Sequence, residues 1–315
     1  MAAELGGGVY ATVRTNIEIS GTTSFENNVA NYGAAFHTYF SIISIVGTIS
    51  IVNNTANLLG AVGIVHSTAV IKANVIFSGN IGSFYMYSGE VSIIPHHSDK
   101  ESFICTGNHP SNTIRNGEKY YSIGSEFIRE GGAITLFVSR LELRTRTILS
   151  HNTASNGGGI MATTSTIMCN STLVISNNFV TDTGGGIYLY QSELSIFGKF
   201  NISNNRARVS GGGVHAISTF LKLIRIHPRL ESKGTMSFES NFANLYGGGA
   251  FFETGSKMNI LRYSLHIVSF SKNTADYGGA IYVADDTNIG MCSSGQKHTL
   301  TAATQSECFF QLLIL

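Results

Sequence analysis

Tryptophan is absent from this sequence of 315 residues, proline occurs only 3 times, and charged residues make up just 12%. The formal net charge is +1. We therefore expect no nucleic-acid partner, because such partners are held by many lysines and arginines against phosphates. No run of 18 or more apolar residues is present, so the sequence predicts no membrane-spanning helix.

Cysteine is also scarce, and its spacing argues against the common zinc motifs. The 4 cysteines form no Cys-x-x-Cys pair, and such pairs are typical of structural zinc sites. Cys292 and Cys308 lie together in a polar segment, which we predict to be a loop closed by a disulfide bond. We expect neither a metal nor a cofactor.

Both ends of the sequence look like cuts in a longer chain. The sequence starts inside a recurring glycine motif, at Gly6-Gly7-Gly8-Val9, and it ends in the apolar stretch 309–315, which we interpret as a truncated strand. The first ten residues have neither the basic nor the apolar region of a signal peptide. We expect a fragment whose signal or anchor lies elsewhere.

Glycine is abundant, with 35 residues, and it recurs at regular intervals, mostly in blocks of two or three and twice as a single glycine followed by alanine. A small and then an apolar residue follow each block, as in Gly131-Gly132-Ala133-Ile134. Most blocks begin 26 or 27 residues after the one before. Their first glycines are Gly6, Gly33, Gly60, Gly131, Gly157, Gly184, Gly211, Gly247 and Gly278.

An asparagine recurs in step with the glycines, and an apolar residue stands three positions before it, as in Phe238 and Asn241. The asparagines are Asn28, Asn54, Asn80, Asn152, Asn178, Asn205, Asn241 and Asn273. An internal repeat with a fixed period is typical of a solenoid, so this pattern decides the fold class.

After each glycine block, apolar residues recur at every second position, with mixed residues between them. This period of two is typical of β-strands. A repeat of about 27 residues has room for three short strands and three turns. The pattern predicts an all-β parallel β-helix of about ten coils, in which equivalent residues stack about 4.8 Å apart. Between the core positions lies an outward column, which we expect to form an exposed stripe: Tyr10, His37, Met161, Tyr188, His215, Phe251 and Tyr282.

The asparagine and the glycines each have a structural purpose in such a coil. Asparagines at the same turn of successive coils pass side-chain hydrogen bonds along the stack, and asparagine tolerates the left-handed backbone of a tight turn. Glycine adopts a positive φ without steric cost and lets neighbouring coils approach closely. We therefore predict a structural asparagine ladder rather than a catalytic motif.

Phe-x-x-Asn combined with Gly-Gly-Ala-Ile resembles the polymorphic outer membrane protein repeat, which is known from bacterial autotransporter adhesins and from surface proteins of some eukaryotes. Phe270 to Asn273 and Gly278 to Ile281 match its two halves. The resemblance covers most of residues 6–283. It implies a right-handed parallel β-helix that is secreted or exposed at a cell surface.

The repeat is interrupted twice, at about 95–120 and at 220–234, and we expect inserted loops there. Such insertions often form binding faces in solenoids. The expected organisation is a β-helix over 1–290, followed over 291–315 by a polar loop with cysteines and the start of a further coil.

Two functions fit these features. The first is a non-enzymatic extracellular or cell-surface protein, a structural or adhesin-like module whose partner is a surface protein or a glycan. The second is a carbohydrate-active β-helix enzyme, a lyase or hydrolase, which needs two or three carboxylates that converge on a groove. Only five aspartates are present, and Asp285-Asp286 is the best candidate for a pair. We favour the first function and expect no catalytic residue.

Overall fold

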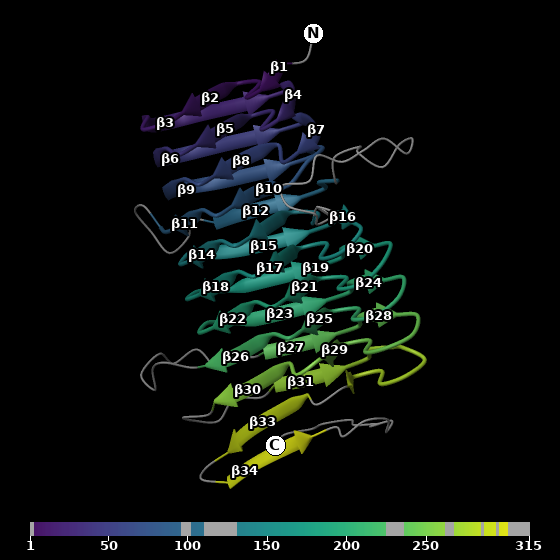
Figure 1. Cartoon of the computed structure of the whole chain (residues 1–315). Helices are drawn as coiled ribbons and strands as arrows, with labels where there is room; N and C mark the ends of the chain where they lie inside the picture. The colour runs from purple at the N-terminus through teal and green to yellow at the C-terminus, as the bar shows by residue number, and fades with distance from the viewer. Residues whose placement is uncertain are drawn as a thin grey trace.

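The computed structural model describes residues 3–95, 102–109, 131–224, 236–261, 268–284, 287–293 and 296–301. These residues form a parallel β-helix in which each turn of the chain stacks on the one before (Figure 1). The prediction of the fold class is confirmed. The N-terminal coils lie at one end of the stack, and the C-terminal strands lie at the other.

The first row of strands follows the glycine blocks and makes one sheet of ten parallel strands. Its members are β2 (Val9–Thr12), β5 (Phe36–Tyr39), β8 (Val62–Val65), β10 (Phe84–Tyr87), β13 (Ile134–Phe137), β17 (Ile160–Thr163), β21 (Ile187–Tyr190), β25 (Val214–Ile217), β29 (Ala250–Glu253) and β32 (Ile281–Val283).

In the first three coils the second and third rows are joined into long strands: β3 (Asn16–Glu26), β6 (Ile42–Val52) and β9 (Thr68–Ser78). Later coils split them. The second row continues with β11 (Glu90–Ile93), β14 (Arg140–Leu143), β18 (Thr166–Cys169), β22 (Glu193–Ile196), β26 (Phe220–Ile224), β30 (Lys257–Leu261) and β33 (Asn288–Ser293). The third continues with β12 (Ser102–Thr106), β15 (Arg146–Ser150), β19 (Leu173–Ser176), β23 (Phe200–Ser203), β27 (Met236–Glu239) and β31 (Val268–Ser271).

Short strands lie along one edge of the stack, and all except the first follow a ladder asparagine (Figure 1). They are β1 (Ala3–Leu5), β4 (Val29–Tyr32), β7 (Thr55–Leu59), β16 (Thr153–Ala154), β20 (Phe179–Val180), β24 (Arg206–Ala207) and β28 (Phe242–Ala243). In the described part of the chain every strand pair is parallel except β33 with β34 (Gln296–Thr301), which is antiparallel.

Most coils bend at three corners, and at each corner a single residue with positive φ turns the chain. Glycines such as Gly157 form the glycine corner, before the first row. Residues such as Gln191 form the hydroxyl corner, between the first and second rows, and residues such as Asn177 form the asparagine corner, after the third row. A single left-handed residue bends the chain sharply between two strands, and glycine and asparagine adopt this conformation most easily.

The core lies inside the coils, and the apolar residues three positions before each ladder asparagine are buried there. They stack from coil to coil, so that the rings of Phe238 and Phe270 lie 4.3 Å apart and nearly parallel. The glycine blocks allow this approach. A Cβ added at Gly158 would lie 2.7 Å from the Cβ of Asn178 and 2.6 Å from the carbonyl oxygen of Gly185. A larger residue there would push the coils apart.

The expected insertion at about 95–120 is partly wrong, because residues 102–109 belong to a coil. Strand β12 pairs with β9 on one side and β15 on the other, and it places Cys105 in the core between Phe77 and Leu149. Residues 96–101 and 110–130 lie outside the described residues, and so do residues 225–235 of the second predicted insertion. Residues 220–224 of that insertion form β26.

The outward column is not the exposed stripe that the alternation predicts. Met161, His215 and Phe251 are buried, although Tyr10 is exposed. Part of the reason is that the turn before the glycine block folds over this sheet: the ring of Tyr246 lies 5.7 Å from that of Phe251. Stacking along the column adds further cover, since the rings of His215 and Phe251 are 4.7 Å apart.

Candidate binding face at the hydroxyl corner

The asparagine corner is filled by a continuous ladder of side-chain hydrogen bonds. The Oδ1 atom of Asn178 accepts hydrogen bonds from the backbone N–H and the Nδ2 of Asn152, at 2.9 and 3.0 Å. Its own Nδ2 donates to Oδ1 of Asn205 and to the carbonyl of Leu149, at 2.9 and 3.0 Å. The same links connect all eight asparagines of the sequence pattern, together with Asn108.

Each interior ladder asparagine thus links three coils. The donors and the acceptor of its side chain all make hydrogen bonds within the protein. The carbonyl that accepts from Nδ2 belongs to the apolar residue of the preceding coil, which explains why the two residues recur in phase. The described ladder therefore has a structural function, and it offers nothing to a ligand except at its half-buried ends, Asn28 and Asn273.

A second ladder, made of serine and threonine hydroxyls, runs along the hydroxyl corner. The hydroxyl of Ser192 donates to the carbonyl of Tyr190 at 2.8 Å and accepts the backbone N–H of Ser165 at 3.1 Å. The same acceptor role is repeated by Ser67, Ser139, Ser165, Thr219 and Ser256. The sequence does contain a signal for this ladder, because a serine or threonine stands seven to nine residues after the first glycine of most blocks. The glycine and asparagine pattern is more conspicuous, so this signal was not recognised.

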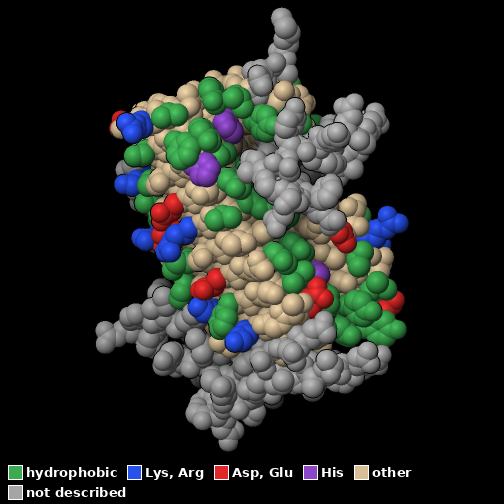
Figure 2. Space-filling view, viewed as in Figure 1, with side chains coloured by type: hydrophobic (Ala, Val, Ile, Leu, Met, Phe, Trp, Pro, Cys, Tyr) green, Lys and Arg blue, Asp and Glu red, His purple; other side chains and the backbone are tan. Residues whose placement is uncertain are grey.

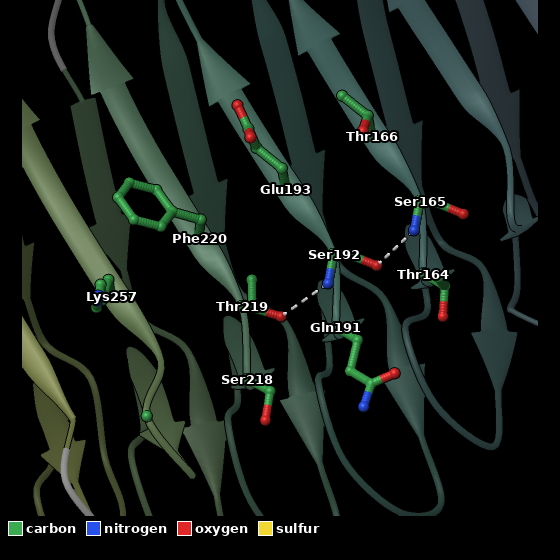
Figure 3. A pocket seen from close by; sticks show the side chains of 11 residues that line it. Thr164, Ser165, Thr166, Gln191, Ser192, Glu193, Ser218, Thr219, Phe220 and Lys257 are labelled. Atoms are coloured by element: carbon green, nitrogen blue, oxygen red, sulfur yellow. Dashed lines mark hydrogen bonds between the residues drawn. The ribbon is translucent and has the colours of Figure 1, made fainter.

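Above this ladder the surface is hollowed. The ladder residues form the floor, the left-handed corner residues form one rim, and the first residues of the second row form the other rim (Figure 3). The lower hollow, of about 380 Å³, is lined by Thr164, Ser165, Thr166, Gln191, Ser192, Glu193, Ser218, Thr219, Phe220, Gly255 and Lys257.

An upper hollow of about 470 Å³ adjoins the lower one and shares Thr164 and Thr166 with it. Its remaining lining residues are His66, Ser67, Thr68, Ser88, Gly89, Glu90, Val138, Ser139 and Arg140. The two hollows together make a mostly polar groove parallel to the axis of the β-helix, because equivalent residues of successive coils line it.

Two pairs of oppositely charged side chains lie beside the groove, and Figure 2 shows adjoining red and blue groups on this face. Arg140 lies 3.6 Å from Glu90, and Nζ of Lys222 lies 2.8 Å from Glu193. The hydrogen bond from Lys222 lowers the pKa of Glu193, and Ser195 adds to this effect. Glu193 is thus held ionised, which is the opposite of what a general acid requires.

The first coils carry an exposed apolar patch at the same corner, made of Val13, Tyr39, Phe40 and Ile42. The exposed fractions of Phe40 and Ile42 are 48% and 58%. The ring of Phe40 stacks on that of His66 at 4.7 Å, and Tyr39 packs edge-on against Phe40 at 4.5 Å. Figure 2 shows hydrophobic side chains and two histidines gathered over these coils. We call these four residues the corner patch.

The sequence-predicted catalytic and disulfide candidates are not placed by the described residues. Asp285, Asp286 and Cys308 lie outside them, while the backbone of Cys292 lies in β33. The disulfide therefore stays a prediction. Cys105 and Cys169 are buried free thiols, and burial raises the pKa of Cys169 to about 11. Within the described ranges no group of three or more His, Cys, Asp or Glu could hold a metal ion.

These observations define a parallel β-helix repeat protein whose buried polar groups serve the fold and whose open groove runs along one corner. Residues 267–284 match the family model of the Chlamydia polymorphic membrane protein repeat. This match spans Phe270 to Asn273 and Gly278 to Ile281, so the predicted resemblance to this repeat family is confirmed. No curated protein and no solved structure matches the chain. Among the described residues, no helix has the length and apolarity needed to cross a bilayer.

Proposed function

We propose that this chain is a non-enzymatic module exposed at a cell surface, and that it binds a surface protein through the corner patch. The observation that carries the proposal is the cluster of large apolar side chains left in water beside a rigid corner. Exposed apolar patches of this kind mark protein–protein interaction sites. The match to a repeat of membrane proteins supports a location at the cell surface.

The geometry supports binding better than catalysis. The glutamates that line the groove are paired with arginine or lysine: Glu90 with Arg140 at 3.6 Å and Glu193 with Lys222 at 2.8 Å. A glycoside hydrolase needs a protonated carboxyl opposite an ionised one. Pairing with a cation favours the ionised form, so these glutamates do not supply the acid.

Adhesion of coated beads to cultured epithelial cells tests the proposal. Beads that carry the purified chain are expected to adhere, and the Phe40→Ser and Ile42→Ser double variant is expected to lose at least tenfold in bound beads. Val138→Ser is the matched control, because Val138 is 56% exposed and has a positive φ at the same corner, outside the corner patch. Equal adhesion of both variants would overturn the assignment of the patch.

The enzymatic alternative is tested with pectin, alginate and glycosaminoglycans, by following reducing ends and unsaturated products. We expect no turnover. Cleavage that disappears in Asp285→Asn or Asp286→Asn would establish the carbohydrate-active enzyme instead.

A further inference from the structure

The lower hollow lies well away from the corner patch in the stack of coils, and its chemistry is different. Three corner residues with positive φ, Thr164, Gln191 and Ser218, form one rim. Their exposed side chains present two hydroxyls and an amide along the groove. The hydroxyl of Ser218 donates to the carbonyl of Thr254 at 3.0 Å, while Thr164 and Gln191 make no side-chain hydrogen bond within the described residues.

The opposite rim combines a hydroxyl, a carboxylate and an aromatic ring, in Thr166, Glu193 and Phe220 (Figure 3). These three residues are in register on neighbouring strands, so they succeed one another along the groove. A ligand that lies in the hollow therefore meets donors and acceptors on both sides and a ring at one point.

The floor of the hollow is rigid. The hydroxyls of Ser192 and Thr219 each donate to a carbonyl two residues earlier and accept a backbone N–H from the preceding coil. The rims are carried on this fixed ladder, so little backbone conformational entropy is lost when a ligand binds.

The charges of the hollow favour an uncharged ligand. Lys222 offsets Glu193 at 2.8 Å, and its Nζ lies 4.8 Å from the centre of the Phe220 ring. Lys257 adds one positive charge at the end of the hollow. A polyanion requires a row of cations, and one lysine beside a neutralised pair does not provide it.

The spacing of the rim residues favours a polysaccharide over a peptide. Each coil supplies one rim residue per side, and successive coils are about 4.8 Å apart, whereas an extended peptide advances only about 3.3 Å per residue. Pyranose rings joined in an extended chain advance by a step similar to the coil spacing, and they offer hydroxyls on both edges and an apolar face for an aromatic ring.

We propose that the lower hollow binds an unbranched, uncharged polysaccharide chain lying parallel to the axis of the β-helix. The sugar hydroxyls hydrogen bond with Thr164 and Gln191 on one rim and with Thr166 and Glu193 on the other. One sugar face packs on Phe220. The chain is bound and not cleaved, because the paired carboxylate of this hollow provides no general acid.

Calorimetric titration with neutral hexasaccharides tests this inference, with cellohexaose, xylohexaose, laminarihexaose and maltohexaose as the probes. At least one is expected to bind with a Kd between about 10 μM and 1 mM, with little change between low and high salt. Heparin and polygalacturonate are the acidic comparators. Absence of binding by all four neutral probes, or salt-sensitive binding of an acidic chain alone, would overturn the proposal.

Variants locate the site. Gln191→Ala and Phe220→Ala are each expected to weaken binding at least fivefold, and together at least twentyfold. Asn204→Ala is the matched control, because Asn204 lies in the same coil as Gln191, is exposed, and has a positive φ at the asparagine corner. Equal losses in the control would contradict the assignment.

The corner-patch variants distinguish this inference from the proposed adhesion. Phe40→Ser with Ile42→Ser is expected to leave saccharide binding unchanged, and Gln191→Ala is expected to leave bead adhesion unchanged. Failure of one test therefore leaves the other proposal standing.

Discussion

The asparagine corner and the hydroxyl corner bend the same chain in the same way, yet the two hollows described above both lie at the hydroxyl corner. At the asparagine corner a long side chain reaches two neighbouring coils, and Asn178 and Asn205 are buried. At the hydroxyl corner the short side chains of Ser165 and Ser192 reach only their own coil and the preceding one. The space above them stays open to solvent.

This difference separates the residues that make the fold from those that are available for binding. Repetition is strongest where a side chain must satisfy buried groups, because every coil meets the same requirement. The positive-φ residues of the hydroxyl corner vary from Phe40 through Val138 to Gln191, since an exposed corner residue has no such requirement. Function is to be sought in the residues that differ between coils.

The largest effect is expected at the asparagine corner. Asn178→Ala removes the partner of the Asn152 N–H and Nδ2 and the side-chain hydrogen bond to the Leu149 carbonyl, all in the interior. We expect the free energy of unfolding to fall by about 3 kcal/mol or more. Urea unfolding followed by circular dichroism measures it. The neighbouring Asn177→Gly, at an exposed position with positive φ, is the control, with a loss below about 1 kcal/mol. A loss in Asn178→Ala as small as in the control would contradict the account.

Acid should weaken the first coils through His37. Burial lowers the pKa of His37 from 6.5 to about 4, so the folded chain holds the neutral ring while the unfolded chain takes up a proton. Stability is therefore greatest above pH 6.5 and falls as the pH drops toward 4, by roughly 2–3 kcal/mol. In His37→Gln the urea concentration at the unfolding midpoint should change less between pH 7 and pH 4 than in the unsubstituted chain. If the midpoint of the variant falls with pH as steeply as that of the unsubstituted chain, groups other than His37 cause the loss of stability in acid.

A smaller effect is expected at the hydroxyl corner. Ser192→Ala leaves the buried N–H of Ser165 without its acceptor, so the free energy of unfolding should fall by about 1–2 kcal/mol. Ser218→Ala, at the exposed rim of the next coil, should change it by less than about 0.5 kcal/mol. If Ser192→Ala were as damaging as Asn178→Ala, the two corners would not differ as described.

The smallest effect has the opposite sign. Val138 is a β-branched residue with a φ of 48°, and its exposed side chain contributes little to the core. Val138→Asn should raise the free energy of unfolding by about 0.5–1 kcal/mol, because asparagine tolerates the left-handed region. Thermal unfolding of the two proteins checks the sign, and a lower midpoint in the variant would refute the reason given for the corner residues.

The fold class and the asparagine pattern were predictable because they rest on identical residues in many coils. Cys105 and Asn108 were not recognised as part of the repeat, because a cysteine replaces the usual aliphatic or phenylalanine residue three positions before the asparagine. The hydroxyl ladder was not predicted, because serine and threonine are common throughout this chain. Their regular recurrence at one corner is therefore hard to distinguish from their high overall frequency.

The surface was less predictable than the interior. A period of two places Phe251 outside the core, but it cannot show that Tyr246 of the preceding turn folds over it. The corner patch depends on side chains from different coils, since Phe40 and His66 are 26 residues apart in the sequence and stacked in the structure. Contacts of this kind depend on which residues of neighbouring coils lie side by side. That register can be read from the sequence only when the position of every turn is known.

The central claim is that the hydroxyl corner binds a partner and the asparagine corner only supports the fold. Bead adhesion to cells by two single variants of one coil tests it most directly. Phe40 and Asn53 are both exposed residues with positive φ, one at each corner. We predict that Phe40→Ser lowers adhesion severalfold while Asn53→Ser leaves it unchanged. Equal adhesion by both variants, or a larger loss in Asn53→Ser, would contradict the claim.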